Sequence, residues 1–447
     1  MDAAVHAQDP FGNAITLQHA ASAAAVAGFV DGFLGYRPSI LAILPAAETD
    51  HSLTVQAYAA ALWMFSESPA GPPKARGHLA RAAAAALPAT ERERQFAAAV
   101  AHWVAGDIGA ALAQHEVLAQ QHPRDLAAIK LGQYHAFNLG DAPTMLRLAL
   151  HALPAAQQVA SLHGLLAFGY EQCHRLSQAE AHARTALAMQ PAEPWAQHAL
   201  AHVMLTDGRV AEGAAFMRQA SPQWAGLTSF MRCHNWWHLA LFEIELGAEA
   251  AALRLYDEQV WGVDKTYSQD QIGAVSLLAR LALVGVDVGP RWQDLAPFLA
   301  QRLSDQVQPF LDLQYLYGLA RAGHPGADTL QAHIEDFAAT APALTRSAWQ
   351  QVAVPAGRGL LAHARSHWAE AARALASAMP HLAALGGSHA QRDLFEQIYL
   401  DALQRSGSGG VAALNLLAPQ ARSQPQSLRL ARQLAALRER LGLPVLR

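Results

Sequence analysis

Four histidines stand in two pairs of identical spacing, and they are the residues of this chain best suited to chemistry. His198 and His202 are four residues apart, and so are His234 and His238. In a helix, residues at i and i+4 share one face, with their Cβ atoms ~5–6 Å apart. Each pair therefore presents two imidazoles on one helix face, and the two pairs place four imidazoles where they could converge.

These histidines admit two interpretations. Neutral imidazole is a common protein ligand for zinc, copper, nickel and iron, which favours a transition-metal or small-ligand site. Alternatively, a histidine at the contact between paired helices is a core residue whose ring nitrogens are satisfied by neighbours. A metalloprotease motif needs Glu after the first histidine, whereas Ala199 and Asn235 follow here. We prefer packing, expect no cofactor, and keep a transition metal as the alternative.

A second group of polar residues lies in GGSHAQRD (386–393). The two glycines allow a tight turn, and Ser388 is a good N-cap for a following helix. The N–H groups of a helix N-terminus also favour an anion, which an arginine can hold with two hydrogen bonds. The candidate ligand-binding residues come from this turn and from two adjacent aromatic residues: His389, Gln391, Arg392, Asp393, Trp236 and Trp237.

The two tryptophans have different expected roles. Adjacent residues on a helix point about 100° apart, because one turn holds 3.6 residues. One of Trp236 and Trp237 is therefore expected to pack inside, while the other lines a surface or groove.

The composition predicts an α-helical protein. About half of the 447 residues are hydrophobic, and alanine, the best helix former, supplies much of that share. Alanine-rich runs such as residues 21–30 and 80–89 are unfavourable in a β-sheet. At this length the chain forms either several domains or one extended array of repeats.

Internal repeats favour the array. Gly106-Asp107 recurs as Gly140-Asp141, a spacing of 34 residues, and each dipeptide stands between two helical patterns. A period near 34 with two helices per unit is typical of tetratricopeptide repeats. The register drifts along the chain, so the repeats are degenerate. The sequence therefore predicts an all-α solenoid of tetratricopeptide-like helix–turn–helix repeats that forms a superhelix.

Three regions are expected along one continuous superhelix: an N-terminal helical region (1–90), central repeats (91–290) and C-terminal helical repeats (291–447). Within the first region, residues 1–14 have the polar composition of a loose start, and an amphipathic pattern predicts a helix over 15–36.

Short Pro- and Gly-containing segments mark the expected breaks between helical pairs. PAGPP (69–73) is predicted to be a loop, VDVGPRW (286–292) a break, and SGSGG (406–410) a flexible connection. None of them is long enough to be a disordered linker between independent domains.

Charge and cysteine content narrow the function classes. The net charge is −4, with three lysines and no basic block, which argues against nucleic acid and anionic membranes as partners. Two cysteines are too few for a disulfide framework. No signal peptide and no apolar run of about 20 residues is evident. We therefore expect a cytoplasmic protein, and the Ala/Arg bias suggests a bacterial one.

Three stretches resemble the tetratricopeptide repeat protein 38 family: WAQHALAHVMLTDGRVAEG (195–213), HNWWHLALFEIELGAEAAALRLYD (234–257) and GGSHAQRDLFEQ (386–397). The resemblance runs from about residue 90 to the end and implies a helical-repeat fold but little about activity. The chain departs from the family pattern at Gly273, where an acidic residue is expected, and at Gln314, where a histidine is expected. Chemistry that depends on those positions would be lost or altered in this member.

The first functional hypothesis is a binding protein whose concave groove receives a peptide, a partner protein or a small molecule. The alternative is an enzyme or metal-dependent pocket built from the two His-x-x-x-His helices and the GGSHAQRD turn. The sequence shows no phosphate loop, nucleophile elbow or Cys-x-x-Cys pair. Binding is preferred because no complete set of catalytic residues can be named.

Overall fold

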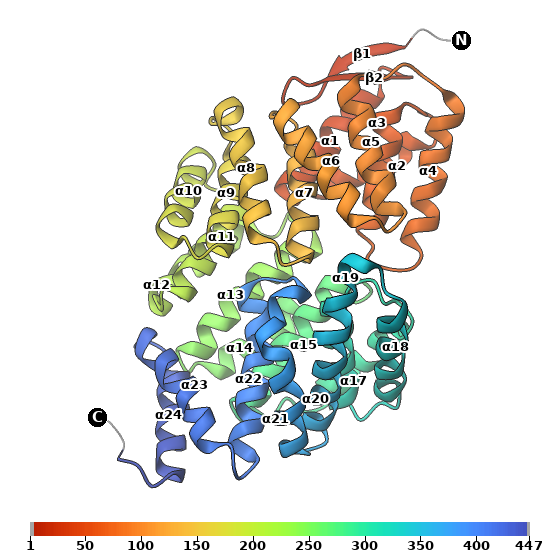
Figure 1. The fold of residues 1–447 in the computed structure, drawn as a ribbon. Helices are drawn as coiled ribbons and strands as arrows, with labels where there is room; N and C mark the ends of the chain where they lie inside the picture. The colour runs from red at the N-terminus through yellow and green to blue at the C-terminus, as the bar shows by residue number, and fades with distance from the viewer. Residues whose placement is uncertain (1–3, 445–447) are drawn as a thin grey trace. The chain divides into compact units, whose positions relative to one another are not determined.

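The computed structural model describes residues 4–444, which form paired helices and one small sheet (Figure 1). Its contacts divide the chain into two compact units. The first comprises Met1–Leu200 and Gly226–Thr228, and the second comprises Ala201–Ala225 and Ser229–Arg447. The three regions expected from the sequence, and their continuity as one superhelix, stay predictions.

The first unit begins with a β-hairpin and continues as consecutive helices that pack on their neighbours in sequence. Its elements are β1 (Val5–Gln8), β2 (Ala14–Leu17), α1 (Ser22–Gly35), a 3-10 turn (Pro38–Ala42), α2 (Ile43–Ala47), α3 (Leu53–Met64), α4 (Gly71–Ala85), α5 (Glu91–Val104), α6 (Ile108–Gln121), α7 (Leu126–Asn138), α8 (Ala142–Ala156), α9 (Ala160–Gln172), α10 (Leu176–Met189) and the start of α11 (Pro194–Thr206).

The Gly-Asp dipeptides make the turns that the repeat pattern predicts. Gly106 and Gly140 have φ values of 82° and 70°, a conformation that glycine adopts without steric cost. The following residues, Asp107 and Asp141, cap α6 and α8 by accepting a hydrogen bond from the backbone three residues on. The prediction of all-α, tetratricopeptide-like helix–turn–helix repeats is therefore confirmed.

The N-terminus differs from its prediction. Residues 1–3 lie outside the described part, but β1 pairs antiparallel with β2 where a loose start and a helix from residue 15 were expected. The carboxylate of Asp9 accepts hydrogen bonds from the N–H groups of Phe11 and Asn13, both at 2.9 Å. This side-chain-to-backbone bonding makes a turn that a search for helical periodicity does not detect. The first helix begins only at Ser22.

The second unit contains the remaining helices, several of them extended by 3-10 or π turns. Its elements are the end of α11, α12 (Val210–Ala220), a 3-10 turn (Ser221–Gln223), α13 (Ser229–Glu245), α14 (Glu249–Leu255), a π turn (Tyr256–Val260), α15 (Ser268–Leu283), α16 (Arg291–Leu299), a 3-10 turn (Ala300–Arg302), α17 (Pro309–Arg321), α18 (Gly326–Thr340), α19 (Ala343–Ser347), a π turn (Ala348–Ala353), α20 (Val354–Ala364), α21 (Trp368–Ala378), a 3-10 turn (Met379–Leu385), α22 (His389–Arg405), α23 (Gly410–Ser423) and α24 (Leu428–Arg440).

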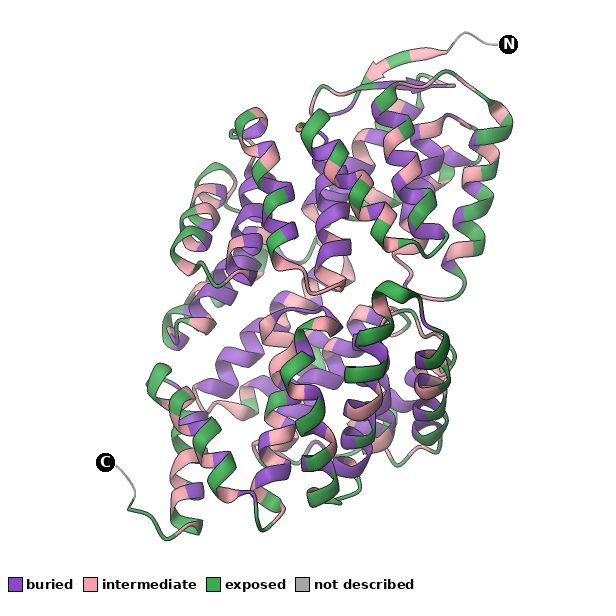
Figure 2. Ribbon diagram, viewed as in Figure 1, coloured by how far each residue is buried: buried purple, intermediate pink, exposed green. Residues whose placement is uncertain are grey.

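The end of the second unit returns to its beginning. Helix α22 packs against α15, and α24 packs against α13. The carboxylate of Glu245, the last residue of α13, accepts hydrogen bonds from the Ser427 hydroxyl and, at 2.6 Å, from the Arg429 guanidinium. Figure 2 shows buried residues along the helix faces that meet in each unit. This return brings polar residues that are far apart in sequence into one interior.

Two predicted breaks shift slightly. Helix α4 begins at Gly71, so Pro72 and Pro73 of the 69–73 segment belong to its first turn, while Pro69 precedes the helix. Proline is tolerated there because its missing N–H has no helical partner in any case. Likewise α16 begins at Arg291, inside the 286–292 segment. The connection predicted at 406–410 lies between α22 and α23, whose bounds leave residues 406–409 outside both helices.

Candidate functional site

Helices α11 and α13 place the four histidines. His198 and His202 lie on successive turns of α11, as His234 and His238 do on α13. A glycine with positive φ lies in the turn that follows each helix, Gly208 after α11 and Gly247 after α13. Each helix therefore presents two imidazoles on one face, as the spacing predicts.

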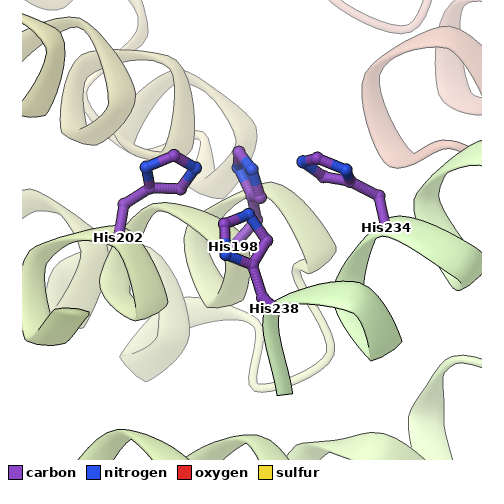
Figure 3. A group of neighbouring side chains, drawn as sticks. All are labelled: His198, His202, His234 and His238. Carbon is purple, nitrogen blue, oxygen red and sulfur yellow. The ribbon is translucent and has the colours of Figure 1, made fainter. Parts of the chain in front are cut away.

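The four imidazoles converge. One ring nitrogen from each histidine can be chosen so that all four atoms lie within 4.8 Å of one another, and Figure 3 shows the rings gathered between the two helices. The ring centroids of His202 and His238 are 4.5 Å apart, and those of His234 and His238 are 4.8 Å apart. The convergence that the spacing allowed is present in the structure.

The cluster is almost completely enclosed. His198, His202 and His238 are buried, and His234 is half-buried. Burial, together with the nearby His202, lowers the pKa of His234 to about 3. A ring with so low a pKa is uncharged at neutral pH, which is the form that accepts hydrogen bonds and binds metals.

Two further residues of α13 border the cluster. The indole of Trp237 stacks on His234 at 5.2 Å between ring centroids and meets His238 edge-on at 4.8 Å. Asn235 is fully buried, and within the described residues neither atom of its side-chain amide finds a hydrogen-bond partner. Asn235 precedes His238 by three residues, so the two share one side of the helix.

Two acidic residues on or just after the cluster's helices, Asp207 and Glu243, pair with arginines. Glu243 bonds to Arg218 at 2.5 Å, and Asp207 lies 3.7 Å from Arg209.

The GGSHAQRD turn has the structure that its capping residues predict. The Ser388 hydroxyl accepts from the N–H of Gln391, and the Gln391 side chain accepts from the N–H of Ser388, which makes a capping box for α22. The Arg392 guanidinium donates to the carbonyl oxygens of Gly386 and Gly387. Part of this polar string therefore serves the turn itself.

The same turn borders a cavity of about 230 Å³ inside the second unit. Charged and polar side chains make up most of its wall, and they come from α11, α13, α15, α22, the segment before α24 and α24. The lining residues are Leu205, Thr206, Leu241, Ile244, Glu245, Arg280, His389, Ala390, Arg392, Asp393, Glu396, Gln397, Gln424 and Arg429.

Arg280 is the lining residue that the sequence analysis missed. It is buried, it donates to the Ser276 hydroxyl, and it donates to the carbonyl oxygen of Ala390 at 2.6 Å. The carboxylate of Asp393 is 3.6 Å away. Burial lowers the pKa of Arg280 to about 10, against the opposing influence of Asp393. A lone arginine in the apolar run AVSLLARLALV was the available signal of a buried charge.

Trp237 joins the two polar regions. The Arg280 guanidinium lies 5.4 Å from the centroid of the indole, and the same indole contacts His234 and His238. Of the predicted ligand-binding residues, His389, Arg392 and Asp393 line the cavity, whereas Gln391 and both tryptophans do not. Trp237 is buried, and Trp236 is half-buried against Trp224 at 4.9 Å between ring centroids.

The fold and the site together define a tetratricopeptide-like helical-repeat protein with a buried histidine cluster beside a polar cavity. No family model matches the chain. Within residues 4–444, no helix combines the length and the apolar character that crossing a membrane requires. The predictions of a cytoplasmic location, a bacterial source and the exclusion of nucleic acid stay predictions.

Solved helical proteins show a distant similarity. The human IFIT1 dimer with PPP-AAAA superimposes with a TM-score of 0.42 at 12% identity, covering 88% of this chain and 87% of that one. A monomeric IFIT1 mutant with Gppp-AAAA has a TM-score of 0.41 at the same identity and coverage. Naa15/Naa10 bound to HypK-THB has a TM-score of 0.26 at 12% identity, covering 90% of this chain and 62% of that one.

Proposed function

We propose that this chain is a ligand-binding helical-repeat protein, similar to the tetratricopeptide repeat protein 38 family, whose cavity receives a small anionic group. The observation that supports this proposal is the buried Arg280 on the cavity wall. A carboxylate or a phosphate is the expected ligand chemistry, because both accept paired hydrogen bonds from a guanidinium.

The charges around Arg280 favour an anion. Its nearest carboxylate, Asp393, is 3.6 Å away and itself 40% exposed, whereas Glu245 bonds to Arg429 at 2.6 Å. Burial and Arg429 disfavour the charged form of Arg280, while Asp393 and Glu245 favour it only in part, since its pKa stays lowered to about 10. A buried charge with incomplete compensation is costly, and an anionic oxygen in the cavity would reduce that cost.

The size of the cavity restricts the ligand. Pockets for drug-sized molecules have volumes of roughly 300–1,000 Å³, so a cavity of about 230 Å³ fits a smaller group. A free metabolite-sized anion and the carboxylate of a peptide end or side chain share the required chemistry. A folded partner segment does not fit inside, although its carboxylate could enter from the surface.

Thermal unfolding with three probes tests this proposal: inorganic phosphate, succinate, and a short peptide with a free C-terminal carboxylate. A ligand that binds the folded state raises the melting temperature in proportion to the logarithm of its concentration. We expect at least one probe to do so. Phosphate or succinate would indicate a small molecule, whereas the peptide alone, compared with its amidated form, would indicate a peptide end.

The variants R280M and R392Q localise the effect. Both are expected to weaken binding of the effective probe by about tenfold or more, as the loss of a charge-assisted contact implies. Arg373 is exposed on α21, away from the cavity, and R373M is the matched control that should bind normally. The proposal fails if none of the three probes binds, or if folded R280M and R392Q bind the probe as well as R373M does.

A further inference from the structure

We propose that His198, His202, His234 and His238 bind one divalent transition-metal ion of the zinc type, at a site separate from the anion-binding cavity. The supporting observation is the convergence of four ring nitrogens, one per histidine, within 4.8 Å. This proposal does not depend on a ligand in the cavity.

The geometry is close to what a tetrahedral ion requires. With Zn–N distances of about 2.0–2.1 Å, neighbouring ligand nitrogens in a tetrahedron are roughly 3.3–3.4 Å apart. The present separations of at most 4.8 Å therefore need to shorten by about 1.5 Å or less. Rotation of the imidazoles about their side-chain bonds supplies this change, because each i,i+4 pair already faces the other from its own helix.

The chemistry of the ligands selects the class of metal. All four are imidazoles, a set that suits zinc, copper, nickel and cobalt rather than magnesium or calcium, which prefer oxygen. Cys233 neighbours His234 in sequence, but its Sγ lies 3.8 Å from Asp270 and contributes no fifth ligand to the described cluster.

The number of ligands indicates a structural role. Four protein ligands complete a tetrahedral shell, whereas catalytic zinc sites keep one position for water or substrate. An ion here would hold α11 against α13, because each helix supplies two ligands. Asn235, buried beside His238 with its amide unpartnered among the described residues, is suited to orienting an imidazole that carries a metal.

A second buried histidine pair shows what packing alone looks like. His115 and His135 are buried with ring centroids 5.5 Å apart, and among the described residues they belong to no group of three or more metal-binding side chains. Two imidazoles cannot complete a tetrahedral shell. This pair therefore supplies the matched control for the cluster of four.

Elemental analysis of the full chain, purified through a tag without histidine, tests the proposal. We expect about one equivalent of a first-row transition metal, predominantly zinc. Removal with a chelator should lower the melting temperature, and Zn²⁺ should restore it by linkage. Reconstitution with Co²⁺ should give the intense visible absorption of tetrahedral cobalt. A content below about a tenth of an equivalent, with no stabilisation by added Zn²⁺, would overturn the proposal.

Variants distinguish this cluster from other histidines. H202Q/H238Q is expected to lose the metal and the visible cobalt bands, while H115Q/H135Q should keep both. If H202Q/H238Q retains a full equivalent of metal, the assignment to these residues is wrong. If that variant does not fold, the cobalt spectrum of the unaltered protein still tests the proposal. The weak visible absorption of octahedral Co²⁺ would contradict a site with four nitrogen ligands from the protein.

Discussion

The guanidinium of Arg280 lies 5.4 Å from the centroid of the Trp237 indole, so one aromatic ring separates the cavity from the histidine cluster. The same indole stacks on His234 and contacts His238. A cation over an aromatic face stabilises both groups when they are shielded from water. A structural change at the cavity or at the histidine cluster would thus affect the other through Trp237.

The two adjacent tryptophans should differ in their effect on stability. W237A removes a fully buried indole and is expected to cost roughly 3–5 kcal/mol. W236A truncates a half-buried ring that packs on Trp224, and we expect about 1–2 kcal/mol. Urea unfolding followed by circular dichroism measures both. Equal losses for the two variants would contradict the structural assignment of Trp237 as the interior residue.

The stability of the second unit should depend on the buried ion pair between Glu245 and Arg429. Arg429 and Glu245 are both largely buried, and breaking a buried pair typically costs about 3–5 kcal/mol because one charge is left uncompensated. E245Q is expected to destabilise the protein to that extent. D328N, which removes the exposed partner of Arg365, should cost less than about 1 kcal/mol. Comparable losses would show that the Arg429 pair is solvated.

Acid should destabilise the protein through His115. Burial lowers its pKa to about 4, so the unfolded chain takes up a proton below the ordinary pKa of about 6.5 while the folded chain does not. The contribution of His115 is fully present above pH 6.5 and is lost as the pH falls toward 4. Leucine cannot take up a proton, so H115L escapes this loss. Between pH 7 and pH 4.5, the free energy of unfolding of H115L should therefore fall by roughly 2–3 kcal/mol less than that of the unaltered protein.

Unfolding in urea at several pH values measures this difference. Glu193 and Asp270 have pKa values raised to about 7 by burial, so they change stability in the opposite direction as the pH falls. Their contributions are common to both proteins and cancel in the comparison. A constant difference between H115L and the unaltered protein from pH 7 to 4.5 would contradict the buried, neutral state of His115.

The N-terminal hairpin should depend on one carboxylate of α5. Glu93 accepts hydrogen bonds from the N–H of Thr16 at 2.8 Å, from the Thr54 hydroxyl at 2.5 Å and from the N–H of Thr90 at 2.7 Å. E93A is expected to cost about 2–4 kcal/mol, because it leaves several buried donors without an acceptor. T90A removes only the helix cap and should cost about 1 kcal/mol.

Proteolysis gives the second measurement for these variants. Cleavage within the hairpin should rise in E93A and not in T90A, since Glu93 bonds to Thr16 of β2 whereas the Thr90 hydroxyl bonds to the backbone of α5. If the protease cleaves the hairpin equally slowly in both variants, the hydrogen bond from Thr16 to Glu93 does not hold β2 in place.

Local patterns predicted the repeated parts of this structure well. The Gly-Asp turns, the capping Ser388 and the i,i+4 histidines each depend on residues within a few positions of one another, so periodicity and capping preferences reveal them. The convergence of the two histidine pairs followed from their similar places in consecutive helical pairs. The hairpin at β1 and β2 escaped because its turn depends on the side chain of Asp9 rather than on periodicity.

The cavity could not be predicted in the same way. Its wall joins Arg280 to Ala390 and Glu245 to Arg429, pairs separated by 110 and 184 residues. Such pairs arise because the last helices pack onto α13 and α15, and no short motif in the sequence specifies that contact. The polar residues around Arg392 could be recognised in the sequence, but their contact with Arg280 could not.

The separation of Glu245 from Arg429 also sets an order of events during synthesis. At about 5–20 residues per second, Glu245 is made roughly 10–40 s before its partner. Many of the intervening helices can pair in that time, because they pack on their neighbours in sequence. The cavity is therefore completed only when α24 has been made, and a nascent chain that stalls before α24 would leave the Glu245 carboxylate without Arg429 and the cavity open to chaperones and proteases.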